Sequence, residues 1–466
     1  MFDPVRRHHE GWLPLAAGLA WTAMALSAGW PWGLPALLPG VFLTGSGAGM
    51  LVWPGDRRQA HIAALGGVVG VLLSVPALLA GAEGLGLALL SAAALWAAGH
   101  HAVVIEPRVE GVPAYPPSPR LAAEVALDEA VLGTMVFTQW FPSMADHVRI
   151  RREVDEALEQ FADAGWLDKP AAYHQTPPAP ERIRLTRRSL RGHDYEHWSA
   201  PSEYAPREGE PGRGRWLDYA PTAMSHAWVV RGDAERPWLL CIHGYRMGHP
   251  LIDLGAFEPA WFHHKLGLNL VIPTLPLHGL RKVGRRSGDG FLGGDLLDSI
   301  HAEAQAMWDL RRLMAWVRSQ TDAPVGAYGL SLGGYTTALL AGLEPDLACA
   351  IPGIPATDFA RLFYHHGEPR QERAALSVGL TREKMSEVLR VVSPLALDPV
   401  VEKSRRAIFG GLADQLVPAD QVRDLWLHWD RPRIEWYPGA HLTLGFHAGV
   451  RRLLFETLSA TGLARG

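Results

Sequence analysis

The chain has 466 residues, of which 48% are hydrophobic and 20% are charged, and its formal net charge is −4. This length exceeds one ordinary domain, so we expect two or three folded units. The charge balance lacks the basic footprint of a nucleic-acid-binding protein, so we expect no nucleic acid partner. The two cysteines, Cys241 and Cys349, lie in apolar runs, which favours a reducing compartment and no disulfide framework.

Four apolar runs at the N-terminus, 12–29, 35–53, 61–80 and 85–104, predict membrane-spanning helices within a region covering residues 1–105. Each run approaches the ~20 residues that a helix needs to cross ~30 Å of hydrocarbon. A cleaved signal peptide would supply a single short apolar region. The alternative is a buried bundle in a soluble domain, but runs such as GVVGVLLSVPALLAG lack a polar face.

The arginines between the predicted spans indicate their orientation. Arg6 and Arg7 precede the first span. Arg57 and Arg58 join the second span to the third, and Arg108 follows the fourth. By the positive-inside rule, we expect the N-terminus and the catalytic domain on the cytoplasmic side. Because no ionisable residue lies well inside a span, the region is predicted to be an anchor embedded in the membrane.

Residues 106–174 are predicted to form a linker and helices. The proline-rich run IEPRVEGVPAYPPSPR leaves the membrane, and two runs with helical spacing follow it. The second of these, DHVRIRREVDEALEQFADAGW, is strongly charged on one side. We expect it to pack on the soluble domain, and the alternative is a helix held against lipid by its arginines.

Residues 175–466 have the pattern of an α/β catalytic domain. Short strand-like pieces over 182–243 predict an antiparallel edge, and strand-like and helical runs alternate from Cys241 onward. This alternation is typical of a mostly parallel sheet with helices on both faces. Residues 357–395 are expected to form a helical cap.

The stretch VGAYGLSLGGYTTALLAG places Ser331 inside a G-x-S-x-G motif. The motif alone is weak evidence, but here a strand runs directly into a helix at the serine, as in a nucleophile elbow. A serine hydroxyl needs a base that is oriented by a carboxylate. Asp414 and His441 follow later strands in the order serine, acid, histidine, and Asp358 is an alternative acid.

An oxyanion hole needs two backbone donors. Leu332, directly after the serine, is predicted to supply one N–H group. The loop in LLCIHGYRMG is expected to supply the other from Tyr245. His243 in this loop is a candidate for substrate binding, and a buried structural histidine is the alternative.

A basic loop, LHGLRKVGRRSGDGF, is predicted at the active-site edge of the sheet. Arg281, Arg285 and Arg286 could bind a phosphate or carboxylate of the substrate, because a guanidinium pairs with these groups bidentately. The alternative is an internal ion-pair network with Asp289 and Asp295. No HExxH or paired C-x-x-C spacing occurs, so we expect no metal.

Residues 182–466 resemble the α/β-hydrolase superfamily, and look most like its dienelactone-hydrolase-like and esterase or lipase branches. The motifs IHGYRMG, YGLSLGGYTTALL, GGLADQLVP and PGAHL fall in the family's order. The resemblance implies a triad of Ser331, Asp414 and His441 and hydrolysis of esters without a cofactor. It does not specify a substrate, since this fold carries many chemistries.

These observations predict a membrane-anchored serine hydrolase that cleaves a small-molecule or lipid-derived carboxylic ester. Two alternatives remain open at this point. One is a serine peptidase-like hydrolase, and the other is a catalytically silent hydrolase fold that serves as a membrane scaffold.

Overall fold

The computed structural model describes residues 9–29, 31, 33–80, 82–138, 142–233, 235–291 and 295–464. Two compact units make up the chain. The helical unit holds residues 1–139 together with Gly411–Asp420 and Trp436–Val450, and the sheet unit holds the rest. The boundaries of these units differ from those of the expected domains, because the segments Gly411–Asp420 and Trp436–Val450 belong to the same unit as the N-terminal helices. Arg6 and Arg7 lie outside the described residues.

The helical unit begins with apolar helices. Its helices are α1 (Trp12–Ala28), α2 (Leu34–Val52), α3 (Arg58–Ala80), α4 (Ala82–Ile105) and α5 (Pro119–Thr138). Three of them, α2, α3 and α4, are long and apolar enough to cross a membrane, while α1 is shorter, with 17 residues. The three long apolar helices match three of the four expected spans, and a span at α1 stays a prediction.

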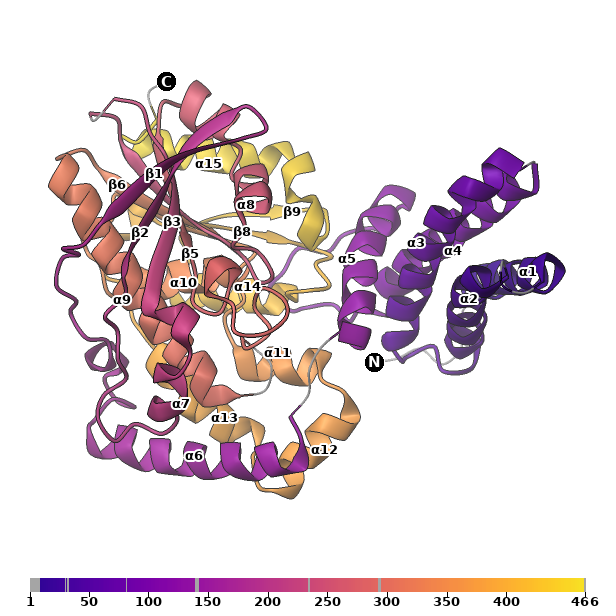
Figure 1. The fold of residues 1–466 in the computed structure, drawn as a ribbon, viewed down its shortest axis with the longest axis horizontal. Coiled ribbons are helices and arrows are strands. Elements are labelled where there is room, and N and C mark those ends of the chain that lie inside the picture. The colour runs from indigo at the N-terminus through magenta and orange to yellow at the C-terminus, as the bar shows by residue number, and fades with distance from the viewer. Residues whose placement is uncertain are drawn as a thin grey trace. The chain divides into compact units, whose positions relative to one another are not determined.

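The strands form one nine-stranded sheet in the order β1-β2-β3-β5-β4-β6-β7-β8-β9 (Figure 1). The strands are β1 (Arg184–Leu190), β2 (His193–Pro201), β3 (Met224–Val230), β4 (Trp238–Ile242), β5 (Asn269–Thr274), β6 (Val325–Leu330), β7 (Ala350–Gly353), β8 (Ala407–Gly411) and β9 (Arg433–Tyr437). Pairing is antiparallel from β1 through β3 to β5, and parallel from β5 through β4, β6 and β7 to β8. The expected mostly parallel sheet with an antiparallel edge is confirmed.

Every residue of β4, β5 and β6 is buried, as expected for central strands that helices cover on both faces. The helices of the sheet unit are α6 (Met144–Asp163), α7 (Arg213–Leu217), α8 (Pro250–Ala256), α9 (Leu296–Gln320), α10 (Leu332–Leu340), α11 (Phe359–His366), α12 (Pro369–Ser377) and α13 (Arg382–Val388). Two further helices, α14 (Ala419–His428) and α15 (Ala448–Ala460), begin in segments of the helical unit and continue in the sheet unit. Helices α11 to α13 occupy the segment expected to form the cap. Their position over a substrate stays a prediction.

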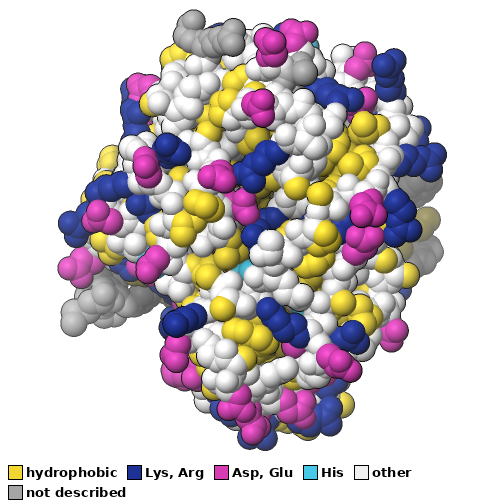
Figure 2. All heavy atoms as spheres, turned by 90° about the vertical axis from the view of Figure 1, so that its left-hand side faces the viewer, with side chains coloured by type: hydrophobic (Ala, Val, Ile, Leu, Met, Phe, Trp, Pro, Cys, Tyr) yellow, Lys and Arg dark blue, Asp and Glu magenta, His cyan; other side chains and the backbone are white. Residues whose placement is uncertain are grey.

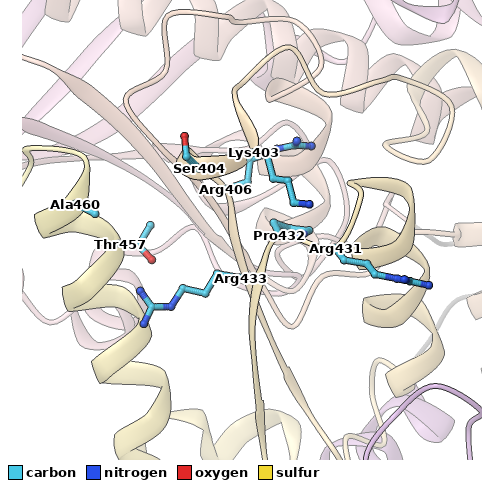
Figure 3. Close-up of a pocket in the computed structure, with 8 residues that line it drawn as sticks. All are labelled: Lys403, Ser404, Arg406, Arg431, Pro432, Arg433, Thr457 and Ala460. Carbon is cyan, nitrogen blue, oxygen red and sulfur yellow. The ribbon is translucent and has the colours of Figure 1, made fainter.

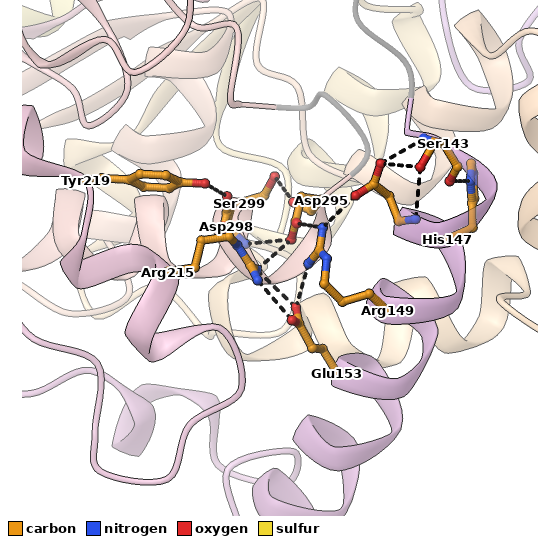
Figure 4. Close-up of polar contacts among 10 residues, drawn as sticks. Ser143, His147, Arg149, Glu153, Arg215, Tyr219, Asp295, Asp298 and Ser299 are labelled. Carbon is orange, nitrogen blue, oxygen red and sulfur yellow. Dashed lines mark hydrogen bonds and ion pairs between the residues drawn. The ribbon is translucent and has the colours of Figure 1, made fainter.

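An ion-pair network fixes α6 to the sheet unit (Figure 4). Arg149 of α6 contacts Asp295 at 2.8 Å, and Arg215 of α7 contacts Glu153 at 2.9 Å and Asp298 at 2.8 Å. The expected packing of this charged helix on the α/β part of the chain is confirmed. Elsewhere on the surface, Figure 2 shows a face on which Lys and Arg side chains are interspersed with Asp and Glu.

Candidate active site

Ser331 lies at a sharp turn between β6 and α10. Its backbone has φ 58° and ψ −114°, a region that non-glycine residues rarely adopt and that costs free energy. The turn is held by two hydrogen bonds. The Ser331 N–H group donates to the Gly353 carbonyl at 2.9 Å, and the Ser331 carbonyl accepts from the Tyr335 N–H group at 3.0 Å. This is the geometry of a nucleophile elbow.

The two glycines of the G-x-S-x-G motif are required by close backbone contacts. A Cβ atom at Gly329 would lie 2.0 Å from the Gly333 carbonyl oxygen, and one at Gly333 would lie 1.9 Å from the Ile242 carbonyl oxygen. Both distances are far shorter than a van der Waals contact. The spacing of the motif therefore follows from how tightly β6, α10 and β4 approach one another.

The loop after β4 lies against the serine. A Cβ atom at Gly244 would be 3.4 Å from the Ser331 Cβ atom. Leu332 is the first residue of α10, and the N–H groups of a first helical turn have no partner within the helix. Its role as an oxyanion donor stays a prediction. The N–H group of Tyr245, next to Gly244, stays a prediction as the second donor.

Asp414 and His441 come together within the helical unit. His441 Nδ1 lies 2.7 Å from Asp414 Oδ2, and both side chains are buried. The other oxygen, Asp414 Oδ1, accepts from the N–H groups of Leu416 at 3.0 Å and Val417 at 2.7 Å. A histidine that donates its Nδ1 proton to a carboxylate keeps Nε2 as the basic nitrogen. The predicted acid–histidine pairing is therefore present in the structure.

A second buried carboxylate, Asp128 of α5, was not predicted from the sequence. It accepts from the N–H groups of His441 at 2.8 Å, Leu442 at 3.1 Å and Gln415 at 3.1 Å. One signal was available in the sequence: Asp128 follows Leu121 and Val125 on the apolar face of its helix, where a carboxylate needs partners.

The pKa values in this cluster are shifted by burial and by charge. Burial, together with the charge of Asp414, raises the pKa of Asp128 to about 7. Burial alone lowers the pKa of His441, but the charge and hydrogen bond of Asp414 and the charge of Asp128 outweigh it, so the pKa is raised. A base with a raised pKa retains its proton-accepting strength near neutral pH.

Ser331 belongs to the sheet unit, whereas Asp414 and His441 belong to the helical unit. The complete triad therefore stays a prediction. Asp358, the alternative acid, caps α11 by accepting from the Arg361 N–H group at 2.9 Å.

Two candidates for substrate binding have structural partners instead. Arg281 is fully buried and pairs with Asp309 at 2.7 Å, so its guanidinium has no face open to a ligand. Its partner is neither of the two carboxylates expected from the sequence. His243 is fully buried, and its Nε2 atom accepts from the Leu275 N–H group at 3.1 Å. Both contacts are those of the structural alternatives, and the roles of Arg281 and His243 in substrate binding stay predictions.

The remaining basic residues of the loop, Arg285 and Arg286, are exposed, and their role in substrate binding stays a prediction. The Arg286 N–H group donates to Asp289 at 2.8 Å, and Asp289 also pairs with Arg246. Among the described residues, no group of three His, Cys, Asp or Glu side chains is arranged to hold a metal ion.

A basic pocket of about 260 Å³ lies in the sheet unit, away from Ser331 of the same unit (Figure 3). It is lined by Lys403, Ser404, Arg406, Arg431, Pro432, Arg433, Thr457 and Ala460. Its position is at the start of β8 and β9, whereas Ser331 follows the end of β6. Figure 3 shows Arg431 and Arg433 pointing in opposite directions, so their charges do not converge on one point.

Proteins from two strains of Mycobacterium tuberculosis, both called uncharacterized, are similar to this chain. The uncharacterized proteins MT2702 and Rv2627c are each 39% identical to it over 355 residues, covering 74% of this chain and 84% of theirs. The chain belongs to the family of these mycobacterial proteins. No model of a described protein family matches it.

Solved structures with an esterase activity in their names resemble the chain at lower identity. An acetyl xylan esterase from Paenibacillus is 16% identical with a TM-score of 0.44, and acetyl xylan esterase 1 from Thermoanaerobacterium is 17% identical with a TM-score of 0.43. Each alignment covers 62% of this chain and 98% of the esterase. The α/β-hydrolase architecture of the chain is apparent in its own sheet order and in the elbow at Ser331.

The Gly333→Ala variant tests the packing of the elbow. The new methyl group would overlap the Ile242 carbonyl, so we expect the free energy of unfolding to fall by about 3 kcal/mol. The measurement is thermal denaturation of the detergent-solubilised chain, followed by circular dichroism. Gly214→Ala in α7 is the control, because its methyl group would enter open space. Equal Tm values for the two variants would contradict the packing argument.

Proposed function

We propose that the chain is a membrane-anchored serine hydrolase that cleaves a carboxylic ester through an acyl-enzyme. The observation that carries this proposal is the buried Asp414–His441 hydrogen bond of 2.7 Å, in a chain whose Ser331 occupies a strained elbow. The serine follows β6 and the acid follows β8, two strands of one sheet. Strand ends of a parallel sheet are where catalytic groups of α/β folds gather.

In the proposed reaction, His441 Nε2 takes the proton of Ser331 as the hydroxyl oxygen attacks the acyl carbon. The N–H groups of Leu332 and Tyr245 stabilise the resulting oxyanion. Collapse of the tetrahedral intermediate breaks the ester bond, and the alcohol leaves with the proton from His441. Water activated by the same imidazole then releases the acid and restores Ser331. Asp414 keeps its charge and stabilises the imidazolium.

The substrate class we propose is a small or lipid-derived ester. Three apolar helices precede the catalytic region and would keep it close to a bilayer, where esters of fatty acids are concentrated. The scaffold alternative is less favourable, because a silent fold gains nothing from a strained serine or from a buried acid–histidine pair.

We place the catalytic region on the cytoplasmic side. Arg57 and Arg58 connect α2 to α3, and Arg108 follows α4, so two connections at one end of the predicted spans carry positive charge. The connection from α3 to α4 carries no lysine or arginine.

The Ser331→Ala variant tests the nucleophile. We expect loss of labelling by a fluorophosphonate probe and a fall of at least about 1000-fold in kcat/KM for a p-nitrophenyl ester. The control is Ser377→Ala, whose hydroxyl is exposed in α12 and bonds to the Ala374 carbonyl of the same helix. Labelling of folded Ser331→Ala at the rate of the control would refute the assignment.

Reporters fused after the C-terminus test the orientation. We expect a fluorescent protein that folds in the cytoplasm to be bright, and an alkaline phosphatase that requires export to be inactive, because the charged connections are retained inside. Active phosphatase with a dark fluorescent fusion would reverse the orientation.

A further inference from the structure

The loops that carry Asp414 and His441 rest on the N-terminal helices. Ala413 and Ala440, the residues directly before the acid and the histidine, are fully buried in one hydrophobic cluster with Leu121 and Val125 of α5. The same cluster contains residues of the apolar helices, Ala60 of α3 and Ala102 and Val103 of α4. One continuous core therefore joins the candidate membrane helices to both catalytic loops.

Helix α5 is fastened to those apolar helices by close backbone contact and by a polar bond. A Cβ atom at Gly99 of α4 would lie 2.0 Å from the Ala122 carbonyl oxygen, and one at Gly133 of α5 would lie 2.3 Å from the His61 carbonyl oxygen. Glu129 of α5 also bonds to His61 Nδ1 of α3 at 2.6 Å. Contacts this close leave α5 little freedom to shift against α3 and α4.

Two acidic residues on the other side of α5 hold the catalytic loops. Glu124 accepts from the Thr443 hydroxyl at 2.8 Å and contacts His447 Nε2 at 3.0 Å, just beyond the histidine. One turn later, Asp128 accepts the three backbone N–H groups of Gln415, His441 and Leu442. Asp128 thus reaches the residue after the acid and the histidine itself, and connects the two loops.

We infer that Asp128 is a positioning residue that holds Asp414 and His441 in hydrogen-bonding geometry, and that α5 and the apolar helices are part of the catalytic framework. This inference rests on the function proposed above.

Asparagine cannot replace this carboxylate. Asp128 Oδ2 accepts from Gln415 and His441, while Oδ1 accepts from Leu442. The amide group of an asparagine would offer one oxygen, and its NH₂ group would face at least one N–H donor. A loop that loses such a bond shifts, and a misplacement of the order of 1 Å can cost about 100-fold in rate.

The charge of Asp128 affects the pH dependence of the rate, which a purely structural role of this residue would leave unchanged. His441 is faced by two carboxylates, Asp414 from the loop after β8 and Asp128 from α5, and both charges raise its pKa. Removing the charge of Asp128 therefore lowers the pKa of His441. Since the base must be neutral to act, the rising limb of the pH–rate profile moves to lower pH in Asp128→Asn.

The experiment measures the second-order rate of fluorophosphonate labelling against pH for the full chain in lipid nanodiscs. We expect Asp128→Asn to label about 100-fold more slowly at its optimum than the wild type, with its rising limb at lower pH. The matched control is Asp163→Asn, the same acid-to-amide change at an exposed position at the end of α6, in the sheet unit. We expect the control to keep the wild-type rate and profile. Labelling of Asp128→Asn at the wild-type rate with an unchanged limb would overturn the inference.

Hydrogen exchange of the wild-type chain provides a second measurement that requires neither activity nor the variant to fold. We expect the amides of Gln415, His441 and Leu442 to exchange as slowly as those of β6, because each donates to a buried carboxylate. Fast exchange of these amides would overturn the positioning role. A wild-type chain that shows no labelling but keeps slow exchange would refute the proposed hydrolase function and leave the Asp128 contacts supported.

Discussion

Three backbone N–H groups from two distant loops converge on the carboxylate of Asp128, and we infer that the arrangement of Asp414 and His441 depends on that convergence. A fully buried carboxylate is costly unless its oxygens are satisfied, and here each oxygen accepts at least one N–H donor. The same bonds favour the loop conformations in which the acid and the imidazole meet at 2.7 Å. On this inference Asp128 acts together with the packing of α5 to set how the two loops are spaced.

Under the proposed function, this arrangement differs from a catalytic domain that is simply tethered to a membrane. Helix α5 bonds to the loops of Asp414 and His441 through Glu124 and Asp128, and to the apolar helix α3 through Glu129. The helical unit contains Asp414 and His441, while the strained Ser331 belongs to the sheet unit. Under the proposed function, changes in the packing of the apolar helices would reach the imidazole directly.

Much of the fold, and the three residues of the proposed triad, could be predicted from local sequence patterns. The elbow at Ser331 was predictable because its glycines, its strand and its helix are neighbours in the chain. Asp414 and His441 were predictable because each follows a short apolar strand in a known order. The role of Asp128 was not, because its partners Gln415 and His441 lie 287 and 313 residues away. The ion-pair alternative for Arg281 was predictable, but its partner was not, because Asp309 lies on α9, outside the basic loop and its nearby carboxylates.

The most direct test is the distance between Ser331 Oγ and His441 Nε2 in an experimental structure of the full chain in lipid. The account predicts a hydrogen-bond distance of about 2.6–3.2 Å, or a single bridging water, with α5 still bonded to the histidine loop. An imidazole turned away from the serine, with no other base in its place, would contradict the account.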